Sequence, residues 1–297
     1  MSAGEQMRQL IQQPGIRVLP GVYDCISAKL AEQAGFEAVF TSGFGISAAT
    51  LGRPDYGFLT ATETLVSVGR MAQAVQIPLV ADLDTGYGNP LNVMRTVTDA
   101  VTAGVAGAIL EDQVWPKRCG HFDGKRVIPA AEQVQKIRAA VQARGESGFV
   151  IVARTDAIAP LGLAEALRRG RAYVEAGADI LFVEAPQSED DLRAIAAAFP
   201  DVPLFANIIE GGKTPYLSGQ ELEAMGFKLA VFALSGLFAA TRAIATCFQH
   251  LRQNGTTAGF ESLLSFQEFE SVIDMDTYRQ LERQFVVPEE STIERTP

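Results

Sequence analysis

The chain has 297 residues, of which 47% are hydrophobic and 20% are charged, and its formal net charge is −10. This length is sufficient for two average domains or for one large α/β barrel. The acidic balance disfavours a nucleic-acid partner, which requires a basic face, and gives no support for an anionic membrane surface. Because the sequence has neither a long unbroken apolar segment nor a signal-like N-terminus, we expect a soluble cytoplasmic protein.

Short apolar or β-branched segments alternate with longer amphipathic segments from residue 17 to about residue 250. This alternation indicates repeated βα units and a parallel sheet. We expect strands at 17–20, 37–42, 78–83, 107–111, 149–154, 179–184, 203–207 and 229–233. Without a linker rich in Pro, Ser or Gly, this set favours a closed (β/α)8 TIM barrel over a doubly wound sheet. We expect one domain over residues 1–285 and a mobile tail over 286–297.

Polar residues follow the predicted strands, at the end where a βα barrel carries its chemistry. The first of these segments is TSGFG at 41–45, which opens a loop of small residues. Its Ser42 and the amide of Gly43 could hold a substrate carboxylate through neutral donors. A plain turn accounts equally well for this segment.

Two aspartates and a glutamate form a candidate metal site. Asp82 and Asp84 follow the third predicted strand, and Glu111 ends the fourth. In an extended segment the carboxylates of Asp82 and Asp84 face the same side, and Mg²⁺ is held by such oxygens together with water and substrate oxygens. The alternative is a turn at Asp84 with an Asx hydrogen bond. The acids at matching strand ends favour the metal site.

Three later strands also end in polar residues. Arg154 ends the fifth predicted strand, Glu184 ends the sixth, and Asn207 and Glu210 stand at and beyond the end of the seventh. In a parallel βα barrel, all of these side chains lie near the same face as the two aspartates. Ionisable groups gathered at one face indicate an active site.

The loop after the fourth strand has the sequence WPKRCGHFDG at 115–124. It places Lys117, Arg118 and His121 around Cys119, with Gly120 beside the cysteine. Cationic neighbours are expected to lower the pKa of the thiol and to attract an anionic substrate, which suits a proton donor, a proton acceptor or a nucleophile. A lone cysteine is more often a small buried hydrophobe, but the polar neighbours favour a catalytic Cys119 on a mobile loop.

These segments resemble the isocitrate lyase and phosphoenolpyruvate mutase superfamily, in particular its small 2-methylisocitrate lyase and 2,3-dimethylmalate lyase-like members, from about residue 15 to residue 285. KRCGH at 117–121 resembles the lyase signature, and DLDTGYG at 82–88, EDQ at 111–113, ARTDA at 153–157 and GADILFVEA at 177–185 match in order and spacing. The resemblance implies a (β/α)8 barrel whose C-terminal helix is swapped between subunits, in a homotetramer built as a dimer of dimers.

The resemblance also implies the roles of the site residues. Mg²⁺, with Mn²⁺ as a substitute, would bind Asp84 directly and Asp82 and Glu111 through water. The implied catalytic residues are Cys119, Lys117, Arg118, His121, Arg154 and Glu111. The implied substrate-binding residues are Ser42, Gly43, Phe44, Asp55, Gly120, Glu184, Asn207 and Glu210.

The activity implied by the resemblance is cleavage of a C–C bond in a 2-hydroxy acid, which gives a 2-oxo acid and a second carboxylate. Phe44 and Ile209 depart from the pattern of 2-methylisocitrate lyases. They disfavour a third substrate carboxylate, because a buried polar group left unpaired costs about 1–3 kcal/mol. We therefore expect a substituted malate such as 2,3-dimethylmalate. The alternatives are an oxaloacetate hydrolase or decarboxylase, a phosphonate enzyme, whose branch usually lacks the loop cysteine, and an inactive barrel.

Overall fold

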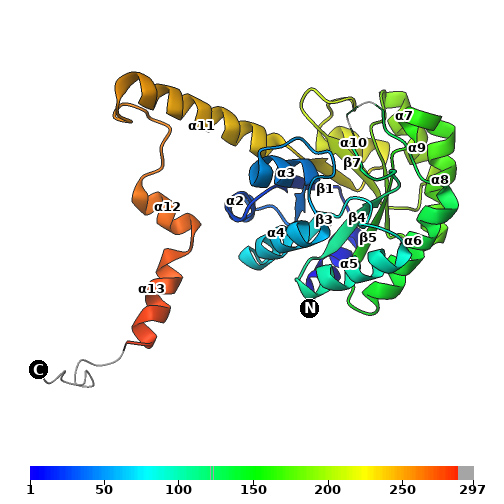
Figure 1. Ribbon diagram of the computed structural model, residues 1–297, viewed down its shortest axis with the longest axis horizontal. Helices are drawn as coiled ribbons and strands as arrows, with labels where there is room; N and C mark the ends of the chain where they lie inside the picture. The colour runs from blue at the N-terminus through cyan, green and yellow to red at the C-terminus, as the bar shows by residue number, and fades with distance from the viewer. Residues whose placement is uncertain (121, 123, 287–297) are drawn as a thin grey trace, which may run out of the picture. The chain divides into compact units, whose positions relative to one another are not determined.

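The chain folds around a closed barrel of parallel strands in the order β1 to β8 (Figure 1). The structure is a computed structural model that describes residues 1–120, 122 and 124–286. The strands are β1 (Arg17–Val22), β2 (Val39–Thr41), β3 (Leu79–Asp82), β4 (Gly107–Glu111), β5 (Val150–Thr155), β6 (Ile180–Val183), β7 (Leu204–Ile208) and β8 (Leu229–Phe232). Pairing of β8 with β1 closes the barrel. The predicted (β/α)8 fold is confirmed, and each predicted strand overlaps an observed one.

Helices connect the strands and surround the barrel (Figure 1). They are α1 (Ala3–Gln12), α2 (Cys25–Gln33), α3 (Gly43–Leu51), α4 (Ala61–Ala74), α5 (Pro90–Thr102), α6 (Ala130–Arg144), α7 (Ile158–Leu161), α8 (Leu163–Glu175), α9 (Glu189–Ala198) and α10 (Gly219–Met225). Polar side chains determine where several of them begin. Asn89, for example, accepts hydrogen bonds from the amides of Leu91 and Asn92 at the start of α5, and thereby satisfies donors that have no partner within the helix.

The apolar core has an inner layer and an outer layer. Inside the barrel, alternate strand residues pack together, and the rings of Phe182 and Phe205 lie with their centroids 4.6 Å apart. Further clusters fill the space between the strands and the surrounding helices. Because side chains fill its interior, the barrel is a packed scaffold rather than a pore, and a ligand binds at its ends.

Helix α1 covers the amino-terminal end of the barrel. Met7 is fully buried within the inner cluster. Ser2 Oγ donates to the carbonyl of Ser147 at 2.7 Å, and Arg8 Nε donates to the carbonyl of Gly148 at 2.7 Å. These bonds attach α1 to the segment that precedes β5. The carboxyl-terminal end of the barrel is left as the place for a binding site.

The chain divides into two compact units, residues 1–242 and 243–297. Helix α11 (Ser235–Asn254) contains the boundary, and the second unit also contains α12 (Phe266–Val272) and α13 (Met275–Gln284). None of the described helices is long and apolar enough to cross a bilayer. The single domain over 1–285 and the swapped C-terminal helix stay predictions. The expected mobile tail lies, apart from residue 286, outside the described residues.

Candidate active site

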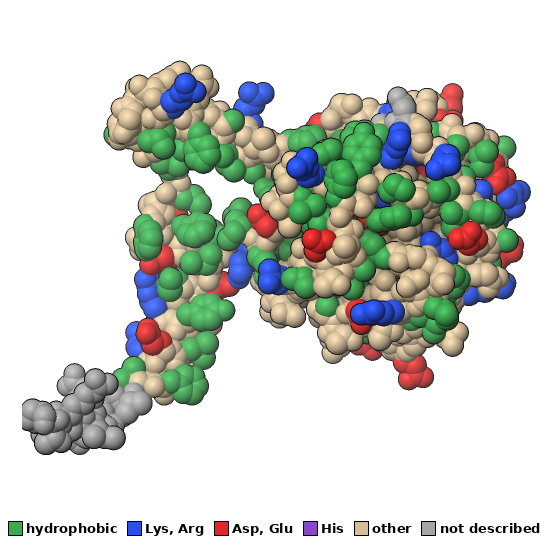
Figure 2. All heavy atoms as spheres, viewed as in Figure 1, with side chains coloured by type: hydrophobic (Ala, Val, Ile, Leu, Met, Phe, Trp, Pro, Cys, Tyr) green, Lys and Arg blue, Asp and Glu red, His purple; other side chains and the backbone are tan. Residues whose placement is uncertain are grey.

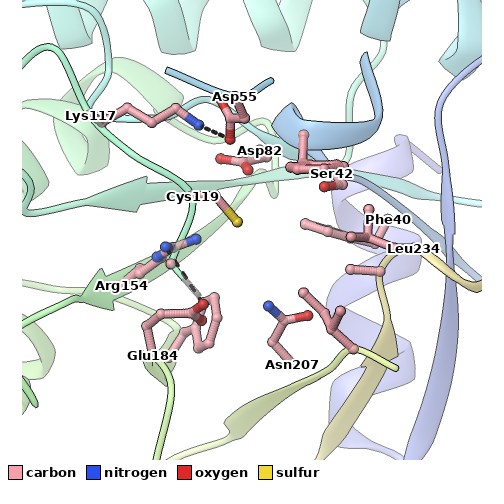
Figure 3. Close-up of a pocket in the computed structure, with 15 residues that line it drawn as sticks. Phe40, Ser42, Asp55, Asp82, Lys117, Cys119, Arg154, Glu184, Asn207 and Leu234 are labelled. Atoms are coloured by element: carbon pink, nitrogen blue, oxygen red, sulfur yellow. Dashed lines mark hydrogen bonds and ion pairs between the residues drawn. The ribbon is translucent and has the colours of Figure 1, made fainter. Parts of the chain in front are cut away.

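A small cavity lies among the carboxyl-terminal ends of the strands (Figure 3). Its lining residues are Phe40, Ser42, Phe44, Asp55, Asp82, Lys117, Cys119, Gly120, Arg154, Phe182, Glu184, Asn207, Ile209, Ala233 and Leu234. Most of the predicted site residues are among them, so the structure brings these residues together. The cavity volume is about 30 Å³, which is space for roughly two water molecules. A dicarboxylate therefore requires displacement of a lining segment to enter.

The segment after β3 holds two carboxylates close together. Asp82 ends β3, and its two oxygens accept hydrogen bonds from the amides of Gly43 and Asp84, each at 3.1 Å. Asp84 has a φ of 51°, in the left-handed region. The predicted extended conformation is therefore wrong, because the chain turns at Asp84 and Asp82 makes the Asx-type bond. The carboxylates still converge, since both have an oxygen 3.1 Å from where a Cβ on Gly43 would lie. Strain of this kind is typical of functional sites.

Lys117 lies between buried carboxylates and balances part of their charge. Its Nζ is 2.6 Å from Asp55 Oδ2 and 2.6 Å from Asp84 Oδ1. Burial raises the pKa of Asp84 to about 7, with the charges of Asp82 and Asp55 adding to this effect and Lys117 opposing it. Burial by itself lowers the pKa of Lys117, but the nearby acids raise it well above its ordinary value. Lys117 is thus a protonated counter-ion of these acids.

Glu111 and Arg154 end the neighbouring strands β4 and β5. Glu111 is 1% exposed, and neither of its oxygens has a hydrogen-bond partner among the described residues. The nearest cation is Arg154, whose Nε is 3.4 Å from Glu111 Oε2. Arg154 instead donates to both oxygens of Asp156, at 2.8 and 3.0 Å. Burial raises the pKa of Glu111 well above its ordinary value, and Arg154 opposes this only in part. The negative charge of Glu111 is therefore incompletely balanced.

The loop after β4 carries Cys119, and the sulfur of this residue points into the cavity (Figure 3). The buried Lys125 holds this loop against β5, because its Nζ donates to the carbonyl of Gly120 at 2.5 Å and lies 3.0 Å from Asp156 Oδ1. Close packing also fixes Gly120, where an added Cβ would lie 1.9 Å from Glu184 Oε1. These contacts thus fix Gly120, next to Cys119, at the cavity wall.

Ser42 and Gly43 begin a helix rather than a loop or a plain turn. Ser42 is the N-cap of α3 and accepts a hydrogen bond from the amide of Gly45 at 3.4 Å. The amide of Gly43, which was expected to hold a substrate carboxylate, donates to Asp82 instead. Ser42 and Phe44 still line the cavity. The Ser42 hydroxyl stabilises the start of the helix, because it satisfies an amide that has no partner within α3.

Besides Gly43, Asp84 and Glu111, three further predicted residues are not among the described residues that line the cavity. Arg118 is not among the described lining residues, and its guanidinium lies 5.8 Å from the ring centroid of Tyr56. Glu210 is also not among them, and it accepts a hydrogen bond from the hydroxyl of Ser235. His121 lies outside the described residues. The roles of these residues stay predictions.

Sequence reasoning missed Lys125 and the apolar side of the cavity. The missed apolar lining residues are Phe40, Phe182, Ala233 and Leu234. A period of two along a strand could have found the two phenylalanines, because Phe40 precedes Ser42 by two positions and Phe182 precedes Glu184 by two. The signal for Lys125 was weaker, since a lysine after a loop glycine is usually exposed.

The site contains more carboxylates than cations. Its buried acids are Asp55, Asp82, Asp84, Glu111, Asp156 and Glu184, and the buried cations beside them are Lys117, Lys125 and Arg154. A dianionic substrate would increase this excess of negative charge, so its binding calls for an added cation. No three described His, Cys, Asp or Glu side chains are arranged as a ready metal-binding group. A divalent cation needs only one or two protein carboxylates with water, however, and Asp84 and Glu111 are the carboxylates that could hold one.

The sequence family described as phosphoenolpyruvate phosphomutase matches residues 7–252 of the chain. This range includes every residue that lines the cavity. The chain belongs to the phosphoenolpyruvate phosphomutase family. It is thus an enzyme of the superfamily that joins isocitrate lyases with phosphoenolpyruvate mutases, as the resemblance of its motifs implied.

Among the relatives of this phosphoenolpyruvate phosphomutase family member are proteins named as lyases and as a mutase. The 2,3-dimethylmalate lyase of Eubacterium barkeri is 42% identical over 96% of this chain and 99% of its own length. The chloroplastic carboxyvinyl-carboxyphosphonate phosphorylmutase of Arabidopsis thaliana is 45% identical over 94% of this chain and 84% of its own length. The 2-methylisocitrate lyase of Bacillus subtilis (strain 168) is 39% identical over 96% of this chain and 95% of its own length.

Solved structures of the superfamily share the whole fold. An oxaloacetate acetylhydrolase in complex with 3,3-difluorooxalacetate has a TM-score of 0.91 and 35% identity, covering 95% of this chain and 97% of its own. A 2,3-dimethylmalate lyase has a TM-score of 0.91 and 35% identity, covering 96% and 95%. A phosphonopyruvate hydrolase in complex with oxalate and Mg²⁺ has a TM-score of 0.87 and 31% identity, covering 96% and 99%.

Proposed function

We propose that the protein is a divalent-metal-dependent C–C lyase. It cleaves a 2-hydroxy dicarboxylate with small alkyl substituents into a 2-oxo acid and a second carboxylate. The observation that carries the proposal is the sulfur of Cys119, which points into a cavity that Arg154, Glu184 and Asn207 also line (Figure 3). Such a cavity offers a proton donor, a cation and an amide to one small carboxylic acid.

The proposed metal is Mg²⁺, for which Mn²⁺ is a substitute. Asp84 would hold it directly, and Asp82 and Glu111 would hold it through water. The incompletely balanced charge of Glu111 and the raised pKa of Asp84 support this assignment, as does the Mg²⁺ complex of the related phosphonopyruvate hydrolase. A divalent ion at this place supplies positive charge and polarises substrate oxygens.

The reaction moves one electron pair through the bond that breaks. Transfer of the 2-hydroxyl proton to a general base gives an alkoxide, which forms the C=O bond of the 2-oxo acid as the C2–C3 bond breaks. The electron pair of that bond moves to C3, beside a carboxylate, and a proton must then be added there. Cys119, which lines the cavity, would donate this proton from its thiol.

Arg154 and Asn207 orient the substrate and offset its charge. Both oxygens of Asp156 accept from Arg154, which fixes the guanidinium in one orientation at the cavity wall. Asn207 Oδ1 has no hydrogen-bond partner among the described residues, so the amide is available to a ligand. Groups held in place before the reaction stabilise developing charge without a reorganisation cost.

The apolar wall opposite these groups supports an alkyl-substituted substrate. Phe40, Phe44, Ile209 and Leu234 form part of the cavity lining. They accept methyl groups, and they offer no hydrogen bond to a third carboxylate, whose burial without a partner is unfavourable. A substituted malate such as 2,3-dimethylmalate therefore fits the wall better than a tricarboxylate such as 2-methylisocitrate.

The test is release of 2-oxo acid from a substrate panel, measured with Mg²⁺ and with a chelator. The panel contains 2,3-dimethylmalate, other alkylmalates, 2-methylisocitrate, isocitrate, oxaloacetate and phosphonopyruvate. We expect metal-dependent release from the alkylmalates and weaker release from the tricarboxylates. Efficient cleavage of 2-methylisocitrate with no activity on alkylmalates would contradict the proposed substrate.

The second candidate is hydrolysis of oxaloacetate to oxalate and acetate. Its support is the oxaloacetate acetylhydrolase structure, which matches this chain over nearly its whole length. Formation of oxalate and acetate from oxaloacetate, with no 2-oxo acid from any hydroxy acid, would assign the protein to this activity. Turnover of phosphonopyruvate alone would assign it to the phosphonate branch.

A further inference from the structure

A second cavity, with a volume of about 480 Å³, lies beside the site on the same unit. Its lining residues are Gly57, Phe58, Leu59, Thr60, Thr85, Tyr87, Gly88, Gln113, Trp115, Ile128, Glu132 and Lys136. The two cavities have no lining residue in common. The second cavity therefore has a lining of its own, and it is large enough for a small organic molecule.

Lys136 of α6 is a buried cation without a partner in this cavity. Its exposed fraction is 3%, and no hydrogen bond or ion pair joins it to the described part of the chain. Glu132, one turn earlier in α6, also lines the cavity but does not pair with it. Burial lowers the pKa of Lys136, although Glu132, Glu111 and Asp112 oppose this effect. A buried ammonium of this kind is stabilised by an anion that reaches it.

The walls around Lys136 are largely aromatic and aliphatic. The rings of Tyr87 and Trp115 have centroids 5.9 Å apart and meet edge to face. Phe58 and Trp115 remain 55% and 45% exposed, so the cavity is accessible from solvent. The cavity is thus complementary to a ligand with a flat apolar body and one negative charge.

We propose that this cavity binds a small amphipathic carboxylate, with its anionic group on Lys136 Nζ and its apolar body against Trp115 and Tyr87. Thr85 adds a hydroxyl to the lining of the same cavity, whereas the hydroxyl of Thr60 donates to Glu63 Oε2 at the start of α4. The proposal does not depend on the reaction assigned to the first cavity, because it uses different residues.

The test uses 3-phenylpropionate as the probe and its neutral amide as the reference. Trp115 is the single tryptophan of the chain, so its fluorescence reports directly on this cavity. We expect a saturable change in that fluorescence with the carboxylate, confirmed by calorimetry on the full chain. The amide should bind about tenfold or more weakly, because it lacks the charge that pairs with Lys136.

Two variants of α6 separate a specific site from a general charge effect. Lys136→Met should weaken binding of the carboxylate by about tenfold or more while leaving the affinity for the amide unchanged, and Lys136→Arg should restore most of the affinity. Arg138→Met removes one positive charge from an exposed position of the same helix. This matched control should bind the probe as the wild type does.

Several results would overturn the proposal. One is the absence of saturable binding of the carboxylate to the wild type. Another is equal affinity of the wild type and of Lys136→Met for the carboxylate, provided that the circular dichroism and thermal unfolding of Lys136→Met are native. A third is loss of probe binding in Asn207→Ala but not in Lys136→Met, because that pattern would place the probe in the first cavity.

Discussion

At the scale of single residues, the charged side chains of the site are kept in place by ion pairs and hydrogen bonds with one another. Lys117 contacts Asp55 and Asp84, and Arg154 contacts Asp156 through both oxygens. Removing one member of such a buried pair leaves an uncompensated charge, which is strongly destabilising. Each of these residues therefore has a structural effect in addition to its proposed chemical one.

Lys125 provides a way to test how much the position of the loop matters. Its ammonium links the Gly120 carbonyl to Asp156, and it is not among the residues that line the cavity. We predict that Lys125→Met lowers kcat by about tenfold or more with a smaller change in KM, since displacement of a proton donor acts on the chemical step.

Steady-state kinetics of 2-oxo acid release measures this effect, with thermal unfolding as the check on folding. Lys125→Arg, which keeps the charge and a hydrogen-bond donor, should recover part of the lost kcat. An unchanged kcat in a folded Lys125→Met protein would show that the loop needs no such attachment.

At the scale of secondary-structure elements, the strands were predictable and the helix at the site was not. The alternation of short apolar and longer amphipathic segments predicted the position of every strand to within a few residues. Buried parallel strands are recognisable in this way because they are short, nearly continuous apolar segments. The segment at 41–45 was expected to open a loop, yet residues 43–51 form α3. Its glycines and serines have weak helix propensity, and tertiary packing decided the outcome.

The candidate site was also predictable from the sequence only in part. The acids at strand ends were predictable, because the βα barrel places them at one face. Their partners were not predictable, because the contacts of Gly43 with Asp82, Lys117 with Asp84 and Lys125 with Asp156 join segments that are distant in the sequence. Such contacts depend on side-chain packing that the spacing of residues along a chain does not encode.

Elements α3 and β7 also determine the proposed substrate preference. Phe44 in α3 and Ile209 just after β7 contribute apolar surface to the cavity. We predict that the double variant Phe44→Gly, Ile209→Thr shifts the ratio of kcat/KM for 2-methylisocitrate over 2,3-dimethylmalate upward by about tenfold or more, because it adds space and a hydrogen-bond donor.

Competition between the two substrates, followed by analysis of the products, measures this ratio directly. Val202→Thr, outside the cavity lining, is the matched control and should leave the ratio unchanged. A double variant that loses both activities in parallel would show that the wall does not discriminate between them.

At the scale of the whole molecule, metal binding should stabilise the folded chain. In the metal-free protein, burial raises the pKa of Asp84 to about 7, so at lower pH a proton occupies this carboxylate and competes with Mg²⁺. Affinity for the ion therefore decreases as pH falls through this value. We predict that Mg²⁺ raises Tm, and that the increase is larger at about pH 8 than at about pH 6.

Differential scanning calorimetry with Mg²⁺ and with chelator at both pH values tests this prediction. Asp84→Asn should show little increase at either pH, since it removes the proposed direct ligand. A Tm that is independent of Mg²⁺ at both pH values would contradict the metal assignment.

The second unit exposes many apolar side chains from the last part of α11, after residue 242, to α13 (Figure 2). Phe248 is 64% exposed, Phe266 is 82% exposed and Phe285 is 78% exposed. Apolar surface of this extent is typical of protein interfaces. We predict a homotetramer in solution, measured by light scattering, and we expect Phe248→Ser with Phe266→Ser to give smaller species. A monomeric wild type at all concentrations would contradict this prediction.

The most direct test of the account is the rate of 2-oxo acid release from 2,3-dimethylmalate with Mg²⁺ by wild type, Cys119→Ser and the control Cys25→Ser, whose cysteine lies in α2 away from the cavity lining. We predict that Cys119→Ser lowers the rate by about 10² or more, because it removes the proton donor, and that Cys25→Ser leaves it unchanged. An undiminished rate in Cys119→Ser, with its fold intact, would contradict the assignment of this thiol to the chemical step.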